Sequence, residues 1–289
     1  MPTILDQARK LSNMDASKRR ARKFPKTPKD LYKVIGYTPR PLQAELEKHE
    51  RRFNAEIMHR RFGKTVCKVI KLLERAAFCP FSEGRYAYAA PTYSMAEDIA
   101  WAYIKLYHSR FLSYLGEEDA TAFQNNSKLF VNVPTKYGGT SRIRLYGVDN
   151  HKERLRGMYL DGIVLDEWAL IPPSVWSEQI RPMLSDEGRS GEDEFGRLNQ
   201  WADFIFTPKG RNHAYTTYER ARKWYAGEAV IVRDDDELGE VELKRDDWFA
   251  ALYRASETKY VKEHELKQAK ADMGQSRYDQ EFECSFEAH

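Results

Sequence analysis

Short apolar runs alternate with longer amphipathic stretches along this chain. The runs Asn54–Met58, Arg85–Ala90, Gly162–Asp166 and Asp203–Thr207 predict buried strands, because each is brief, mostly apolar and bounded by polar or turn-forming residues. After the first run, apolar residues recur at helical spacing over residues 65–78. Strands that alternate with helices predict an α/β fold with a mainly parallel sheet flanked by helices, whose ligands bind at the carboxyl ends of the strands.

The rest of the pattern predicts further elements. Alternating polar and apolar residues on both sides of Tyr137-Gly138-Gly139 predict a β-hairpin built from Lys128–Val133 and Ser141–Tyr146. Residues 184–199, rich in Gly, Asp and Glu, predict a flexible surface loop. A strand is expected at Ala229–Arg233, and helices are expected at Leu31–Phe53, Met95–Leu115, Tyr215–Tyr225, Trp248–Tyr253 and Glu263–Met273.

Composition narrows the class of protein. Of 289 residues, 42% are hydrophobic and 31% are charged, which is typical of a soluble globular protein, and no stretch of eighteen apolar residues predicts a membrane span. The three cysteines have neither a disulfide pattern nor zinc spacing, so a reducing cytosol is expected. The net charge is only +3, but residues 1–30 hold nine basic and three acidic side chains. This basic arm suits DNA phosphates or an acidic partner, or it is a solvated leader.

The segment His59–Thr65 ends like a phosphate-binding loop. Such a loop presents backbone N–H groups to phosphates and leads into a helix. Gly63 would allow close approach of the backbone, Lys64 would supply positive charge, and the Thr65 hydroxyl would face Mg²⁺. The usual pattern has a glycine where this chain has Met58. The alternative is therefore a turn followed by an ordinary helix.

A second motif follows about a hundred residues later. Asp166 and Glu167 come directly after the apolar run Gly162–Leu165. In nucleotide hydrolysis, the first acid at such a strand end holds the water shell of Mg²⁺ and the second polarises the attacking water. The alternative is a strand that ends in a solvated turn. Together the two motifs predict binding and hydrolysis of a nucleoside triphosphate, and Glu167 argues against a switch that binds without turnover.

The loop Arg60-Arg61-Phe62-Gly63-Lys64-Thr65 resembles that of the large terminase subunit of tailed bacteriophages, which also carries an arginine and lacks the first glycine. The resemblance covers roughly residues 35–289 and includes further motifs in the family's order. These motifs are Pro39–Gln43, Ala89–Tyr93, Leu155–Gly157, Leu165–Ala169 and Thr207–Gly210.

The resemblance implies a role for each matching residue. Gln43 would contact adenine, and the nucleotide would be bound by Arg60, Arg61, Gly63, Lys64 and Thr65. Mg²⁺ would be held by Thr65 and Asp166. Catalysis would involve Glu167, Arg60 and Arg156, with Arg156 acting in trans on a neighbouring subunit, and Thr207 would couple hydrolysis to motion. Structural alternatives stay open for four of them: Gln43 as a solvated helix residue, Arg61 as a solvent-facing or ion-paired residue, Arg156 as an ion-pair partner, and Thr207 as a turn cap.

The resemblance also implies a domain plan. It predicts a P-loop NTPase of the RecA-like (ASCE) class with a small lid subdomain. The expected parts are a basic arm at 1–34, an ATPase core at 35–211, a lid at 212–265 and a linker at 266–289 toward a C-terminal nuclease domain. The carboxylate cluster of a two-metal nuclease is missing from this sequence. Nuclease activity is therefore not expected of this chain alone.

The implied function is that of an ATPase motor of viral genome packaging. With ATP and Mg²⁺, it would move double-stranded DNA into a procapsid. The expected partners are the DNA, the portal protein, the small terminase subunit and further copies of itself in a ring. No membrane partner is expected, and the expected location is the host cytoplasm. The alternative is a helicase-like DNA-remodelling ATPase, which normally needs a second motor lobe for which 289 residues leave no room.

Overall fold

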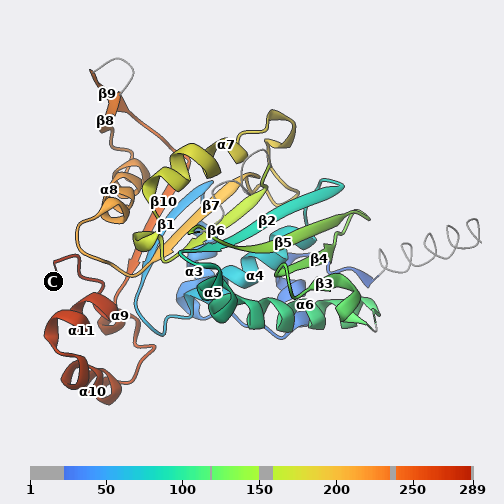
Figure 1. The fold of residues 1–289 in the computed structure, drawn as a ribbon, viewed down its shortest axis with the longest axis horizontal. Helices are drawn as coiled ribbons and strands as arrows, with labels where there is room; N and C mark the ends of the chain where they lie inside the picture. The colour runs from blue at the N-terminus through green and yellow to red at the C-terminus, as the bar shows by residue number, and fades with distance from the viewer. Residues whose placement is uncertain (1–22, 118, 150–158, 235–238, 288–289) are drawn as a thin grey trace, which may run out of the picture.

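An eight-stranded, mostly parallel sheet forms the centre of the molecule in the computed structural model, which describes residues 23–117, 119–149, 159–234 and 239–287. The strand order is β10-β1-β7-β6-β2-β5-β4-β3, and only the pairs β5–β4 and β4–β3 are antiparallel. This arrangement confirms the predicted α/β class (Figure 1). The strands of this sheet are β1 (Phe53–Met58), β2 (Glu83–Ala90), β3 (Gln124–Asn125), β4 (Phe130–Pro134), β5 (Thr140–Gly147), β6 (Gly162–Asp166), β7 (Trp201–Phe206) and β10 (Trp248–Tyr253).

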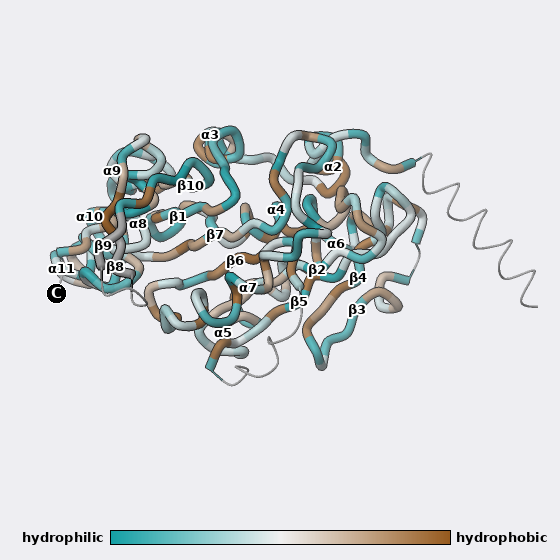
Figure 2. The backbone as a smooth tube through the Cα atoms, turned by 90° about the horizontal axis from the view of Figure 1, so that it is seen from above, coloured by the Kyte–Doolittle hydropathy of each residue, from teal (hydrophilic) through white to brown (hydrophobic). Residues whose placement is uncertain are grey.

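Helices cover the sheet, and the two large apolar cores lie on its opposite faces. The described helices are α2 (Pro28–Ile35), α3 (Pro41–His49), α4 (Lys64–Ala77), α5 (Tyr93–Ala96), α6 (Ala102–Leu115), α7 (Arg181–Met183), α8 (His213–Tyr225), α9 (Ala255–Thr258), α10 (Glu263–Met273) and α11 (Gln275–Glu281). Strands β1, β6 and β7 are buried along their whole length, as expected of parallel strands covered on both faces. Figure 2 shows β6 and β7 between α3 and α4 on one side and α7 on the other.

Most predicted elements are present, including the four core strands and the hairpin, which is β4 and β5. Two helix predictions are wrong. The predicted helix Leu31–Phe53 is two helices and the start of β1, because Gly36 ends α2 in the left-handed region (φ 68°) and Pro41 begins α3. The predicted helix Trp248–Tyr253 is strand β10, which pairs in parallel with β1. Periodicity cannot separate a strand from a helix in so short an apolar run.

Strand β10 lies within residues 212–265, the range expected to form a lid, so this part of the range belongs to the central sheet. The same range contributes α8 and the two-stranded ribbon of β8 (Val230–Asp234) and β9 (Gly239–Leu243), which projects beyond α8 (Figure 1). Among the described residues, no helix is both long enough and apolar enough to cross a membrane.

Candidate functional site

The phosphate-binding motif forms a tight loop between β1 and α4. The chain leaves β1 at Met58 and enters α4 at Lys64, so the first turn of the helix follows the loop directly. Gly63 has φ 91°, and a Cβ at this position would lie 2.9 Å from the Gln43 amide nitrogen. The backbone conformation therefore favours glycine, and a larger residue would displace the Gln43 amide. Met58 itself is fully buried, and the loop closes without a glycine there.

Three neighbouring strands bring together one predicted residue each from the nucleotide-binding, catalytic and coupling groups. Strands β1, β7 and β6 are adjacent; Thr207 and Glu167 directly follow β7 and β6, and Lys64 begins the helix after the loop that leaves β1. The Lys64 ammonium lies 2.9 Å from Glu167 Oε1 and donates a hydrogen bond to Thr207 Oγ1 at 3.1 Å. The residues from the two nucleotide motifs and the coupling motif thus form one contact network around a single cation.

Glu167 adopts an unusual backbone conformation. Its φ of 53° places it in the left-handed region, which is uncommon for residues other than glycine. The preceding carboxylate stabilises this turn, because Asp166 Oδ1 accepts a hydrogen bond from the Glu167 amide at 2.9 Å. Strain of this kind often occurs at functional sites, and here it directs Glu167 toward Lys64.

Burial dominates the electrostatics of Asp166. It raises the pKa of this carboxyl, and the positive charge of Lys64 opposes that shift. The Tyr88 hydroxyl donates a hydrogen bond to Asp166 and lies near the Thr65 hydroxyl. Asp166 and Thr65 therefore lie around one shared neighbour. A carboxylate and a hydroxyl are hard oxygen donors of the type that Mg²⁺ binds, so these residues fit a magnesium site.

Burial alone would lower the pKa of Lys64. The negative charges of Glu167 and Asp166 outweigh that effect, so the pKa of Lys64 is raised from its ordinary value. The ammonium group is thus positively charged throughout the physiological pH range. It is held in the position where a loop lysine would meet the phosphates of a nucleotide.

Gln43 contacts the loop through its buried amide. Its nitrogen lies 3.2 Å from the Phe62 carbonyl and 3.4 Å from the Gly63 carbonyl, and its oxygen accepts from the Arg40 amide at 2.9 Å. Gln43 is therefore not a solvated residue. The role of adenine contact stays a prediction.

Two residues that contact the site were missed by sequence reasoning. The Arg40 guanidinium donates to the carbonyls of Arg61 and Phe62 at 2.9 and 3.1 Å and lies over the Tyr260 ring. Tyr88, from the middle of β2, holds Asp166. Arg40 belongs to the Pro39–Gln43 motif, which was already expected to lie beside the nucleotide, so the motif could have pointed to Arg40. No signal in the sequence pointed to Tyr88.

The loop arginines lie at the surface. Arg60 and Arg61 are both exposed, and within the described part of the chain no side-chain partner is seen for either. Arg61 has φ 74°, so the loop turns through the left-handed region at this residue as well. Solvent exposure leaves both guanidinium groups available to a ligand. Arg156 and most of the basic arm lie outside the described residues, so their assigned roles stay predictions.

The C-terminal segment packs against the loop. The Arg60 amide donates to the Glu281 carbonyl at 2.8 Å, and the buried His59 ring lies 2.8 Å from Thr258 Oγ1. The Gln280 amide donates to the carbonyl of Pro208, directly after Thr207, at 2.6 Å. The segment that was expected to be a linker therefore contacts both the phosphate-binding loop and the coupling motif.

Comparison with known proteins finds relatives among the large terminase subunits of phages. No family model matches the chain. The large terminase subunits of Thermus virus P23-45 and Thermus phage G20c are each 30% identical to it over 192 residues, which is 64% of this chain and 36% of each relative. The chain is a homologue of phage large terminase subunits. It spans about a third of the length of the curated relatives that it matches.

Solved structures of large terminases share the fold. The ATPase domain of the Thermus phage P74-26 large terminase has a TM-score of 0.65 and 23% identity, covering 88% of this chain and 96% of that domain. The large terminase of the thermophilic bacteriophage D6E has a TM-score of 0.53 in complexes with ADP and with ATP-gamma-S, at 15% and 16% identity. Both D6E comparisons cover 89% of this chain and 52% of that protein. These neighbours confirm the predicted P-loop class of fold.

Proposed function

We propose that this chain is an ATP-hydrolysing motor region that moves double-stranded DNA during phage genome packaging. The observation that carries the proposal is the contact of Lys64 with both Glu167 and Thr207. It joins the loop that would bind phosphate, the acid that would activate water and the residue that would transmit motion. The homology to large terminase subunits supports the same function.

The contacts of Lys64 suggest how binding would be sensed. The ammonium group of Lys64 is paired with Glu167. The β- and γ-phosphates of ATP would compete for Lys64, because a polyphosphate carries more negative charge than one carboxylate. Glu167 would then be free to orient water for in-line attack, and Thr207 would lose its hydrogen bond from Lys64.

Asp166 and Thr65 would hold Mg²⁺, which would neutralise phosphate charge when bound. Release of phosphate would restore the pair of Lys64 with Glu167 and the contact with Thr207. The hydrogen bond between Lys64 and Thr207, at the end of strand β7, would thus break and re-form once in each cycle of hydrolysis. Double-stranded DNA, the portal protein, the small terminase subunit and a ring of further copies in the host cytoplasm are the partners and setting that we propose with this function.

The test uses two substitutions that affect different steps. Glu167→Gln preserves the size of the side chain and removes its charge, so we expect nucleotide binding to remain and turnover to fall by about 10²–10⁴. Lys64→Ala should instead weaken binding of the nucleotide itself. Binding is measured with a fluorescent ATP analogue, and turnover is measured by phosphate release in the assembled packaging motor.

Lys223→Ala, in the last turn of α8, serves as the control for removal of a lysine. In the same assay, Arg156→Ala should lose turnover if that arginine completes a neighbouring site. Wild-type phosphate release from Glu167→Gln would contradict the assigned chemistry. Hydrolysis without any DNA movement in the assembled motor would contradict the proposed function.

A further inference from the structure

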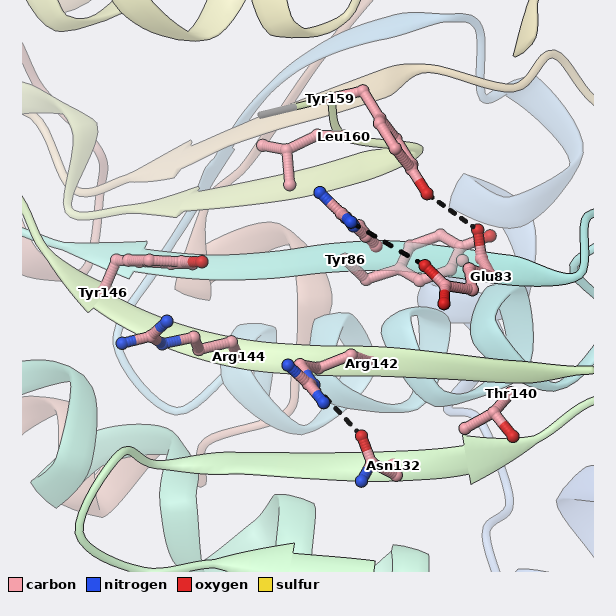
Figure 3. Close-up of a pocket in the computed structure, with 11 residues that line it drawn as sticks. Glu83, Tyr86, Asn132, Thr140, Arg142, Arg144, Tyr146, Tyr159 and Leu160 are labelled. Carbon is pink, nitrogen blue, oxygen red and sulfur yellow. Dashed lines mark hydrogen bonds and ion pairs between the residues drawn. The ribbon is translucent and has the colours of Figure 1, made fainter. Parts of the chain in front are cut away.

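Three arginines share one face of the sheet on neighbouring strands. Arg85 on β2 is in register with Arg142 on β5, which is in register with Asn132 on β4. Arg144 follows two residues later on β5 and so projects from the same face as Arg142. The intervening Ile143 belongs to the core on the other face, beneath α4 and α6. Figure 3 shows Arg142 and Arg144 side by side on β5, with Asn132 on the adjacent strand.

This face contains a groove of about 460 Å³. The three arginines and Asn132 line it together with Tyr159 and Glu83. Glu83 and Thr140 are the first residues of β2 and β5, so the groove extends toward the amino ends of these strands. The phosphate-binding loop lies at the carboxyl ends. The groove is therefore separate from the proposed ATP site.

The positive charge in the groove is poorly compensated. Within the described residues, neither Arg142 nor Arg144 forms an ion pair, and the buried Arg144 Nε atom has no hydrogen-bond partner. Arg85 has only Glu83, at 3.7 Å, and that carboxylate is 71% exposed. By contrast, the fully buried Lys68 ammonium is paired and lies 2.7 Å from Glu56. Unpaired cations in a cleft indicate a place for an anion.

Surrounding side chains hold the arginines in place. Arg142 lies 4.3 Å above the Phe130 ring, and its Nε donates to Asn132 Oδ1 at 3.1 Å. The Arg85 guanidinium lies 4.2 Å from the centre of the Tyr159 ring, which also contacts Arg189 at 4.0 Å. Such contacts reduce the entropy that the arginines would lose on binding a ligand. The guanidinium groups are therefore preorganised for planar oxyanions such as phosphates.

We propose that this groove binds the phosphate backbone of double-stranded DNA. The arginines stand at backbone positions about 5–7 Å apart along and across the strands, a spacing that suits a polymer with closely spaced negative charges. Arginines aimed at phosphates do not distinguish base sequences, as a translocating motor requires. The inference rests on the proposed function in one respect, because it takes the anion to be the DNA that the motor would move.

The test measures DNA binding without ATP. A fluorescent duplex of about 30 base pairs, in two unrelated sequences, is titrated with the protein in EDTA at several salt concentrations. For Arg142→Gln/Arg144→Gln we expect roughly tenfold weaker binding of both sequences, and a slope of log K against log salt that is smaller by about 2. Arg142→Lys/Arg144→Lys keeps the charges, so it should recover much of the affinity.

The charge-matched control is Arg222→Gln/Arg277→Gln, which removes two exposed arginines from α8 and α11. Circular dichroism and thermal melting check that every variant is folded. Wild-type affinity and salt slope in the Arg142→Gln/Arg144→Gln protein would overturn the proposal. Altered self-association with unchanged DNA binding, or displacement of DNA by millimolar pyrophosphate with no release by unlabelled duplex, would overturn it as well.

Failure of the groove and failure of the motor give different results. Lys64→Ala should bind DNA normally while losing nucleotide binding, and Arg142→Gln/Arg144→Gln should keep its basal ATP turnover in the absence of DNA. If Arg142→Gln/Arg144→Gln loses DNA binding and the wild-type protein does not hydrolyse ATP, the DNA-binding groove is supported and the proposed motor function is contradicted. Normal turnover with unchanged DNA binding in that variant would contradict only the groove.

Discussion

Gln43 is bonded to its surroundings through both ends of its amide. The nitrogen faces the carbonyls of Phe62 and Gly63, while the oxygen accepts from the Arg40 amide and the Tyr37 hydroxyl. With these bonds in place, the amide stabilises the shape of the loop. At the scale of the residue, Gln43 thus has a structural role that does not depend on which base is bound.

This role leads to a prediction about nucleotide affinity. Gln43→Ala should weaken ATP and GTP binding to a similar extent, about tenfold, because loss of the amide leaves loop carbonyls without partners. Gln43→Glu keeps the acceptor for Arg40 and removes the donor to the loop, so it should be at least as weak. Calorimetric titration with both nucleotides measures the effect. A change in the ratio of ATP to GTP affinity would instead support the adenine contact that the resemblance implies.

The residues predicted from sequence were those whose chemistry depends on local spacing. Gly63, Lys64 and Thr65 stand at fixed positions around a helix start, and Asp166 and Glu167 stand at a strand end. A motif contains that information by itself. Tyr88 and Arg40 reach the site only because separate elements meet in three dimensions. The spacing of residues along the chain does not predict that Tyr88 and Arg40 lie close to the site.

At the scale of the element, helix α4 is attached to the sheet by charge. Lys68 is fully buried and lies 2.7 Å from Glu56 on β1 and 2.8 Å from Asp203 on β7. Lys71 also pairs with Asp203, at 2.9 Å. Burial would raise the pKa of Asp203, but the two lysines outweigh it and lower that pKa. The helix that follows the phosphate loop is therefore fixed to two of the strands whose ends form the site.

The elements that sequence assigned correctly are those with clear periodicity and boundaries, such as the strand that ends at Asp166. Strand β10 was assigned wrongly because its pairing with β1 decides its conformation. Phe53 at the start of β1 lies in register with Trp248, and their rings are 5.3 Å apart. Tertiary pairing of this kind overrides the local preference of a six-residue run.

Helix α6 contains a buried histidine that should make the fold sensitive to acid. His108 is fully buried, its Nε2 lies 2.9 Å from the Asn132 carbonyl, and its Nδ1 has no partner. Burial lowers the pKa of His108 from 6.5 to about 4. The unfolded chain therefore binds a proton more readily than the folded chain between these two values. This contribution to stability is present above pH 6.5 and is lost as the pH falls toward 4.

Between pH 7 and pH 5, the loss from His108 should be about 2 kcal/mol of unfolding free energy. His108→Gln removes the titration and retains a donor for the Asn132 carbonyl. We therefore expect the variant to lose less stability than the wild type over this range, whatever its stability at pH 8. Urea unfolding at several pH values measures the difference. Parallel curves for the two proteins would show that His108 does not set the acid sensitivity.

At the scale of the whole molecule, the end of the described chain packs against the phosphate-binding loop and the coupling motif. Helix α11 lies beside the loop, where the Glu281 carbonyl accepts from the Arg60 amide and Gln280 donates to the Pro208 carbonyl. Lys209 adds an ion pair with Glu281 at 3.5 Å. These contacts join the C-terminal segment directly to the phosphate-binding loop and to the coupling motif.

We therefore expect nucleotide binding to be detectable in the C-terminal segment. A nucleotide that orders the loop also restrains the Arg60 amide, so ATP-gamma-S should slow hydrogen exchange in residues 275–284 as well as in the loop. Lys64→Ala, which should not bind the nucleotide, should show neither change. Gln280→Ala should raise the basal exchange of the segment and reduce its response, because the hydrogen bond to the Pro208 carbonyl is lost. Exchange mass spectrometry can resolve both regions. If ATP-gamma-S protects the loop while exchange in 275–284 stays unchanged, the segment is only packed against the site and does not respond to it.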